Sequence, residues 1–146
     1  MRYTLAAGLI LASDRISKFL VMRHMTEGQS IPLLPPLLYV TYVQNRGAAF
    51  GFLQGQTVLL SAIALLCLLF ISTQWKKIMA KSPFVRWGVV IALMGAIGNL
   101  IDRLRWGAVI DFVDIRIFVF NVADTAIVAG VGLLFWEVLI HDRKEG

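Results

Sequence analysis

The sequence predicts an all-α membrane protein: a bundle of four transmembrane helices with a small β region outside the membrane. Of the 146 residues, 58% are hydrophobic and only 16% are charged, which is far more apolar than a soluble domain. Four apolar stretches also reach or approach the roughly 20 residues that a helix needs to cross the hydrocarbon core of a bilayer. The length is typical of one domain, so residues 1–146 are expected to form a single integral membrane unit.

The first helix is expected over residues 4–22, where Asp14, Arg15 and Lys18 interrupt an otherwise apolar run. Because Arg2 precedes this run, the segment could instead be a secretory signal. The internal charges, and the return of the apolar pattern in FLVM, favour a helix that the mature protein retains.

The connection that follows is expected to hold β structure, at about residues 30–56. The prolines of IPLLPPLL exclude a continuous helix. YVTYVQ is β-branched or aromatic at most positions, and NRG can supply a turn. A short strand or hairpin outside the membrane is therefore expected. The apolar stretch AAFGFL is too short to span the bilayer and could lie in the interface or under the strands.

Three further helices are expected over residues 57–74, 86–101 and 122–140. The first of these carries no charged residue, and the last carries only Asp124 near its start and Glu137 near its end. The run GAIGN places small residues on one helix, as is common where two helix backbones approach closely.

The distribution of Lys and Arg predicts which side of the membrane faces the cytoplasm. Seven basic residues lie at the termini and in the link between the second and third helices: Arg2, Lys76, Lys77, Lys81, Arg86, Arg143 and Lys144. Five lie in the connections on the opposite side: Arg23, Arg46, Arg103, Arg105 and Arg116. Because short cytoplasmic loops are enriched in basic residues, both termini are expected in the cytoplasm.

Charge and cysteine content argue against several other classes of protein. The net charge is +5, but the basic residues are scattered among apolar runs, so no nucleic-acid partner is expected. The single cysteine, Cys67, lies within an apolar run and cannot form an internal disulfide. With only His24 and His141 besides, no Cys and His metal cluster is expected, nor an obvious histidine-based catalytic triad.

Polar residues at membrane depth are the candidates for chemistry, because burying an ionisable side chain there costs about 2.5–3.5 kcal/mol on insertion scales. Asp14 and Lys18 are four residues apart and share a helix face, so they can form an ion pair. This pair could stabilise a bundle interface or bind a polar part of a substrate. At the end of the third helix, Asn99 and Asp102 share a face, and Asp102 with Arg103 could form an interfacial ion pair or cap.

Three more acids follow. Asp111 and Asp114 lie among aliphatic and aromatic residues in AVIDFVDI, an unusual setting for acids of a surface loop. Asp124 has a local explanation, because Asn121 is a natural N-cap and an acid three residues later resembles a capping box. An acid in the first turn also favours the helix dipole.

Four polar residues nevertheless map to one face of the membrane, at helix ends that a compact bundle would bring together: Asn99, Asp102, Asp111 and Asp124. Two carboxyl groups held close together cannot both ionise easily, so one keeps its proton. The ionised member can take a proton from water while the protonated member polarises a carbonyl group. This is the chemistry of an aspartic protease.

Five motifs carry a resemblance: DRISK (14–18), NRGAAFG (45–51), GNLIDR (98–103), VIDFVD (109–114) and FNVADTAI (120–127). Together, and in this order, they resemble the motif set of the lipoprotein signal peptidase family, the type II signal peptidases of bacteria. The resemblance implies four transmembrane helices in the bacterial cytoplasmic (inner) membrane, cytoplasmic termini and a small extracytoplasmic β-cradle between the first two helices.

The resemblance also implies an activity. Such an enzyme is an aspartic endopeptidase that removes the signal peptide of a prolipoprotein, cutting just before a cysteine that carries a diacylglyceryl group. No metal or organic cofactor is implied. The expected partners are diacylated prolipoproteins and membrane lipids, and the cyclic peptide globomycin is the expected inhibitor.

By the same resemblance, the catalytic dyad would be Asp111 and Asp124. The supporting or substrate-positioning residues would be Asp14, Lys18, Asn45, Arg46, Asn99, Asp102, Arg103 and Asn121. One departure is the stretch IRIFV between VIDFVD and FNVAD, which is shorter than is common in the family. It could narrow the loop near the site and alter substrate or inhibitor fit, but both aspartates remain in place.

Two other classes of protein are alternatives. A small proton-coupled transporter or channel subunit could use intramembrane carboxylates as a relay, but a relay needs acids spread across the bilayer. Here the acids gather toward one side, and the second helix has none. A scaffold or assembly subunit would explain the small-residue helix faces, but not the gathering of acids with Asn99 and Asn121.

Overall fold

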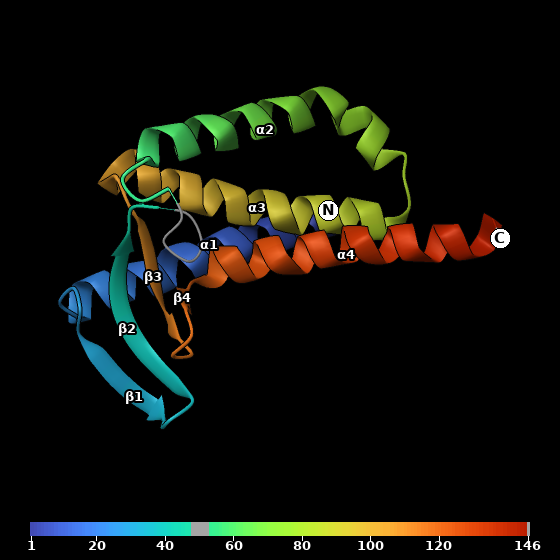
Figure 1. The fold of residues 1–146 in the computed structure, drawn as a ribbon. Helices are drawn as coiled ribbons and strands as arrows, with labels where there is room; N and C mark the ends of the chain where they lie inside the picture. The colour runs from blue at the N-terminus through green and yellow to red at the C-terminus, as the bar shows by residue number, and fades with distance from the viewer. Residues whose placement is uncertain (48–52, 146) are drawn as a thin grey trace.

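The computed structural model describes residues 1–47 and 53–145. Four helices account for most of these residues: α1 (Arg2–His24), α2 (Thr57–Met79), α3 (Pro83–Trp106) and α4 (Val122–Glu145). They extend from one end of the molecule, where a small sheet lies across them (Figure 1). Each helix is longer than the stretch expected from its apolar run, because the helical backbone continues into flanking residues, many of them polar or charged.

Three of the described helices are long and apolar enough to cross a membrane: Thr57–Met79, Pro83–Trp106 and Val122–Ile140. The chain is therefore a membrane protein by composition. The helix α1 has 23 residues but holds the charged residues Asp14, Arg15 and Lys18 in its centre. By length and composition the described helices thus support three spans, and the expected count of four is not confirmed.

The sheet is antiparallel, with strands in the order β1 (Ser30–Leu34), β2 (Leu38–Asn45), β3 (Val109–Asp114) and β4 (Val119–Phe120). The prediction of β structure between the first two helices thus covered only half of the sheet. The strand β3 was not predicted because its two acids mask the run of Val, Ile and Phe that favours a strand. The apolar stretch AAFGFL lies, apart from its last residue, outside the described residues.

The helix α3 leads directly into the sheet. It begins with Pro83 in its first turn and with the Ser82 hydroxyl accepting a hydrogen bond from the Val85 amide, both common at helix starts. It ends at Gly107, whose φ of 69° is the left-handed conformation that stops many helices. Strand β3 begins two residues later, so the position of α3 determines where β3 enters the sheet.

Helices α3 and α4 pack with their backbones in close contact. A β-carbon at Gly95 would overlap the Ala123 carbonyl oxygen, and one at Gly88 would lie 2.8 Å from the Gly130 carbonyl oxygen. The prediction that the GAIGN run lies at a close helix contact is confirmed. This contact positions the start of α4 against the last turns of α3.

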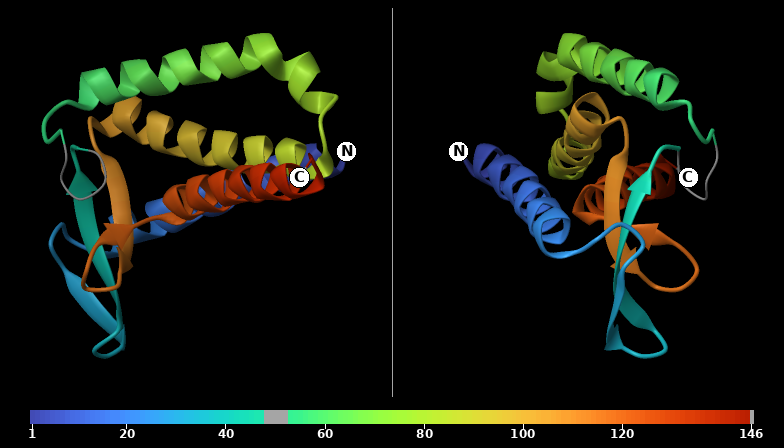
Figure 2. Two further views of the ribbon diagram at one scale, coloured as in Figure 1. Left: turned by 45° about the vertical axis from the view of Figure 1, so that its right-hand side comes forward. Right: turned by 90° about the vertical axis from the view of Figure 1, so that its left-hand side faces the viewer.

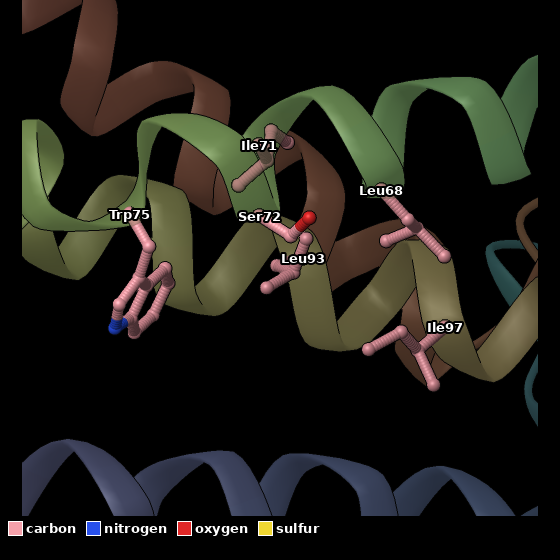
Figure 3. A pocket seen from close by; sticks show the side chains of 6 residues that line it. All are labelled: Leu68, Ile71, Ser72, Trp75, Leu93 and Ile97. Atoms are coloured by element: carbon pink, nitrogen blue, oxygen red, sulfur yellow. The ribbon is translucent and has the colours of Figure 1, made fainter.

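Helix α2 packs mainly on α3, and in Figures 1 and 2 it lies apart from α1. Between α2 and α3 is an apolar cavity of about 350 Å³ (Figure 3). Its lining residues are Leu68, Ile71, Ser72, Trp75, Leu93 and Ile97. The two chain ends lie at the end of the bundle away from the sheet (Figure 2).

Candidate active site

Strand β3 places Asp111 against β2. In the register of the two strands, Asp111 pairs with Val43 and Val109 pairs with Asn45, so Asp111 and Asn45 are diagonal neighbours on one face of the sheet. The Asn45 side-chain amide donates to Asp111 Oδ2 at 2.9 Å. Asp111 is buried, with 2% of its surface exposed. The strand pairing therefore supplies the first partner of this carboxyl group.

Asp124 lies in the first turn of α4, and its expected capping role is confirmed. The Asn121 side-chain oxygen accepts from the Asp124 amide at 2.9 Å, and Asp124 Oδ2 accepts from the Asn121 amide at 3.2 Å. These reciprocal bonds form a capping box. The other oxygen, Oδ1, accepts from the Asn99 side-chain amide at 2.7 Å. Asp124 thus caps α4 and at the same time extends toward α3.

Asn121 joins the two acids. Its side-chain amide donates to Asp111 Oδ1 at 2.6 Å and to Asn99 Oδ1 at 3.1 Å, while its backbone amide donates to Asp124. The residue is fully buried. One asparagine therefore contacts both carboxyl groups, which come from a strand and a helix.

Behind the acids lies a buried charge cluster between α1 and α3. Lys18 Nζ is 2.9 Å from Asp14 Oδ1 and 2.7 Å from Asp102 Oδ2, so the ion pair expected within α1 is confirmed. Arg15 lies 2.6 Å from Asp14 and 2.7 Å from Asp102. The Arg15 contact to Asp102 Oδ1 is a close ion pair whose geometry does not meet that of a hydrogen bond. The two cations and two anions of this cluster balance.

The cluster also holds the backbone next to each aspartate. Asp102 Oδ2 accepts from the Ile110 amide at 3.3 Å, one residue before Asp111. Asp14 Oδ1 accepts from the Ala123 amide at 3.1 Å, one residue before Asp124. A separate bond, 3.0 Å from Lys18 Nζ to the Asn99 side-chain oxygen, connects the cluster to the asparagines. The cluster, with Asp14 on α1 and Asp102 on α3, therefore helps to position both acids.

Arg15 was missing from the predicted site. The sequence offered one signal, a second cation beside Asp14 in an apolar helix. Arg15 is adjacent to Asp14, and adjacent residues do not share a helix face, so the spacing did not pair Arg15 with Asp14. The contacts with Asp14 and Asp102 form because the long guanidinium side chain reaches around α1 to the Gly98 carbonyl, 3.0 Å away.

The two predicted arginines lie differently. Arg103 is half-buried and donates to the Gly47 carbonyl at 3.2 Å, and its charge interacts with those of Asp111 and Asp124. The Arg46 side chain is exposed, and within residues 1–47 and 53–145 it makes no hydrogen bond or ion pair with the acids. Over the same described residues, no group of His, Cys, Asp and Glu could hold a metal ion.

The environment of Asp111 changes its ionisation. Burial raises the pKa of Asp111 to about 7, and the negative charge of Asp124 acts in the same direction. The amide donors of Asn45 and Asn121, and the charge of Lys18, oppose this rise in pKa. Near neutral pH the Asp111 carboxyl group is therefore partly protonated, as a general acid needs to be.

Asp114, three residues along the same strand, behaves in the opposite way. The Thr41 hydroxyl donates to it at 2.6 Å and lowers its pKa. Arg116, with a φ of 70°, follows in the turn between β3 and β4 and donates its amide to Asp114 at 2.7 Å. The first four residues of the short IRIFV stretch thus form a tight hairpin turn, and its last residue, Val119, begins β4. The two acids of VIDFVD lie on opposite faces of β3, because side chains alternate along a strand.

Comparison with known proteins agrees with this architecture. A model of the signal peptidase (SPase) II family matches residues 6–140. The lipoprotein signal peptidase of Moorella thermoacetica is 40% identical over 147 residues, covering 100% of this chain and 98% of that protein. The one of Halalkalibacterium halodurans is 42% identical over 149 residues, covering 99% and 96%.

The fold is shared as well. A bacterial membrane enzyme solved by the in meso method at 2.3 Å resolution superposes with a TM-score of 0.92 at 28% identity. The match covers 99% of this chain and 92% of that one. Sequence and fold thus indicate a membrane protease that acts on the signal peptides of lipoprotein precursors. The chain belongs to the signal peptidase II family.

Proposed function

We propose that the protein is an aspartic endopeptidase that cuts prolipoproteins just before their diacylglyceryl-modified cysteine, with Asp111 and Asp124 as the catalytic dyad. The observation that carries this proposal is the double contact of Asn121, which donates to both carboxyl groups. A shared donor keeps two acids at one place, where they can act on one water molecule and one peptide bond.

The raised pKa of Asp111 supports a division of roles. Protonated Asp111 donates to the scissile carbonyl oxygen, and ionised Asp124 takes a proton from the attacking water. The water oxygen bonds to the carbonyl carbon, giving a tetrahedral intermediate. When the carbon–nitrogen bond breaks, Asp124 returns its proton to the leaving amine and Asp111 recovers its own from the intermediate. Both acids end in their starting states.

The other predicted site residues would act around this dyad. Asp14, Lys18 and Asp102 would hold the backbone next to the acids, as their amide contacts suggest. Asn45, Asn99 and Asn121 would orient the carboxyl groups. Arg46 and Arg103 would position the substrate backbone.

A four-span topology accompanies this proposal, with α1 as the fourth span. At 1.5 Å per residue its 23 residues extend about 35 Å, enough to cross the hydrocarbon core. Charged residues lower the mean hydropathy of α1 even when they are paired within the protein. The side chains of Asp14 and Lys18 face inward, and each residue is only 1% exposed. The outward surface of α1 carries apolar side chains such as Leu9, Ile16 and Phe19, which are 57–68% exposed.

Both termini would then face the cytoplasm, on the side of the basic link between α2 and α3. The dyad would lie at the outer edge of the cytoplasmic (inner) membrane. The signal helix of the substrate would enter laterally while its lipid chains remain in the bilayer. Reporter domains fused to each terminus test this topology: both should be inaccessible from outside the cell, and an accessible one would refute it.

The activity is tested with purified protein and a diacylated prolipoprotein, with and without globomycin. Asp111→Asn and Asp124→Asn should each abolish the cut before the lipidated cysteine while the protein stays folded. Asp114→Asn is the matched control, because this acid lies on the same strand but on its other face, and it should retain processing. Full activity of either dyad variant would refute the dyad.

The transporter alternative finds no support in this arrangement. A proton relay needs acids distributed across the bilayer, whereas Asp102, Asp111 and Asp124 are joined at one end of the bundle. Helix α2, the most apolar of the spans, contributes no acid.

A further inference from the structure

A basic groove lies beside the charge cluster, between α1 and the last turn of α3. Its volume is about 610 Å³. From α1 it is lined by Arg15, Lys18 and Arg23, and from α3 by Arg105. Aromatic and apolar side chains, including Phe19 and Trp106, complete its walls. The groove lies at the sheet end of the bundle, because both helices end there.

The cations of the groove differ in how they are neutralised. Arg15 and Lys18 are balanced by Asp14 and Asp102 in the buried cluster. Arg23 and Arg105 are exposed, and across the described part of the chain neither makes a salt bridge. Two guanidinium groups therefore bring positive charge to one groove without a protein anion to offset it.

The remaining contacts of these arginines leave their hydrogen-bond donors available. The Arg105 guanidinium carbon lies 4.8 Å from the centre of the Trp106 ring, an arrangement that holds an arginine in place through cation–π attraction. Guanidinium groups bind phosphate through paired N–H donors in a fixed geometry. An anion with several acceptor oxygens would satisfy them.

The apolar walls indicate what else the ligand carries. Phe19 is 57% exposed and Trp106 is 47% exposed, so both present apolar surface beside the arginines. Arg23 is eight residues beyond Arg15, about 12 Å further along α1. The groove thus has exposed basic groups near the helix ends and the apolar side chains of Phe19 and Met22 next to them, with the neutralised Arg15 and Lys18 beyond. This order matches a charged headgroup followed by hydrocarbon.

We propose that this groove binds an anionic phospholipid, with the headgroup phosphate on Arg23 and Arg105 and the acyl chains along Phe19 and Met22. Basic residues are commoner on the cytoplasmic side of membrane proteins, whereas Arg23 and Arg105 lie at the end of the bundle proposed to face outward. A lipid phosphate would give these two arginines an anionic partner there. The site is distinct from the dyad, because neither Asp111 nor Asp124 lines the groove.

Native mass spectrometry of the purified full-length protein tests the proposal, in detergent micelles containing equal amounts of phosphatidylglycerol and phosphatidylcholine. The unmodified protein should retain phosphatidylglycerol in preference. The double variant Arg23→Gln/Arg105→Gln should retain it about tenfold less, the order expected on losing charge-assisted hydrogen bonds. The control Lys76→Gln/Lys77→Gln removes the same charge from exposed residues in the last turn of α2, at the end of the bundle away from the groove. This control should retain the lipid normally.

Three results would overturn the assignment. The first is equal retention of the two lipids by the unmodified protein. The second is equal loss of phosphatidylglycerol in both double variants, which would indicate a general charge effect. The third comes from an arm with sn-glycerol 3-phosphate in place of lipid. If it raises the thermal unfolding temperature as much as phosphatidylglycerol does, the groove takes a free phosphate and not a lipid.

Discussion

The pH dependence of cleavage can be shifted by one side chain, Asn45. The Asp111 carboxyl group has a pKa of about 7, and the proposed mechanism needs it protonated. Activity should therefore fall as the pH rises through about 7, when Asp111 loses its proton. The Asn45 amide donates to this carboxyl group and opposes the rise in its pKa. Asn45→Ala removes that donor, so the pKa should rise and the fall in activity should move to higher pH.

The size of the shift follows from the contact. A hydrogen bond to a charged group contributes about 1.5–3 kcal/mol, and one pKa unit corresponds to about 1.4 kcal/mol. Asn45 is only half-buried, and water can replace part of the lost bond, so the lower end of the range applies. Asn45→Ala should raise the pKa of Asp111 by about one unit.

The assay is kcat/KM for a diacylated prolipoprotein peptide, measured from about pH 5 to about pH 9, where the alkaline limb reports the acid of the free enzyme. Gln44→Ala is the matched control. Gln44 is the neighbouring residue of β2, and its side chain donates to the Tyr42 hydroxyl at 3.1 Å, so its removal should leave the limb in place. If the alkaline limb of Asn45→Ala keeps its position or moves to lower pH, the predicted rise in the pKa of Asp111 is refuted. This holds whether or not the maximal rate changes.

Two further substitutions test how the acids are positioned. Lys18→Met should lower stability by about 3–5 kcal/mol, because it leaves the buried carboxyl groups of Asp14 and Asp102 with one cation fewer; an unchanged thermal unfolding temperature in detergent would contradict this. Gly95→Ala should lower both the unfolding temperature and the processing rate, since its β-carbon would overlap backbone at the start of α4. Gly8→Ala, with open space at its β-carbon, is the control and should keep both the unfolding temperature and the processing rate. If the two alanine variants lose stability and activity equally, the close contact of α3 and α4 is not the cause.

Local features of this protein followed from the sequence because they depend on residues close together in one helix. The capping box of Asn121 and Asp124 spans three positions, and the ion pair of Asp14 and Lys18 spans four. Helical geometry alone brings such residues together. The apolar runs likewise predicted where the membrane helices lie, since a helix in lipid must satisfy its own backbone.

The tertiary structure decided what surrounds the acids. Asn45 and Asp111 are 66 residues apart, and Asp14 and the amide of Ala123 are 109 apart; no periodicity predicts such contacts. They depend on which strand pairs with β2 and on how closely α3 and α4 pack. Arg15, which is adjacent to Asp14 in the sequence, contacts Asp14 and Asp102 through the length of its side chain. The sequence by itself thus determined the helices and the residue types of the site, while packing between distant segments determined which acids share Asn121.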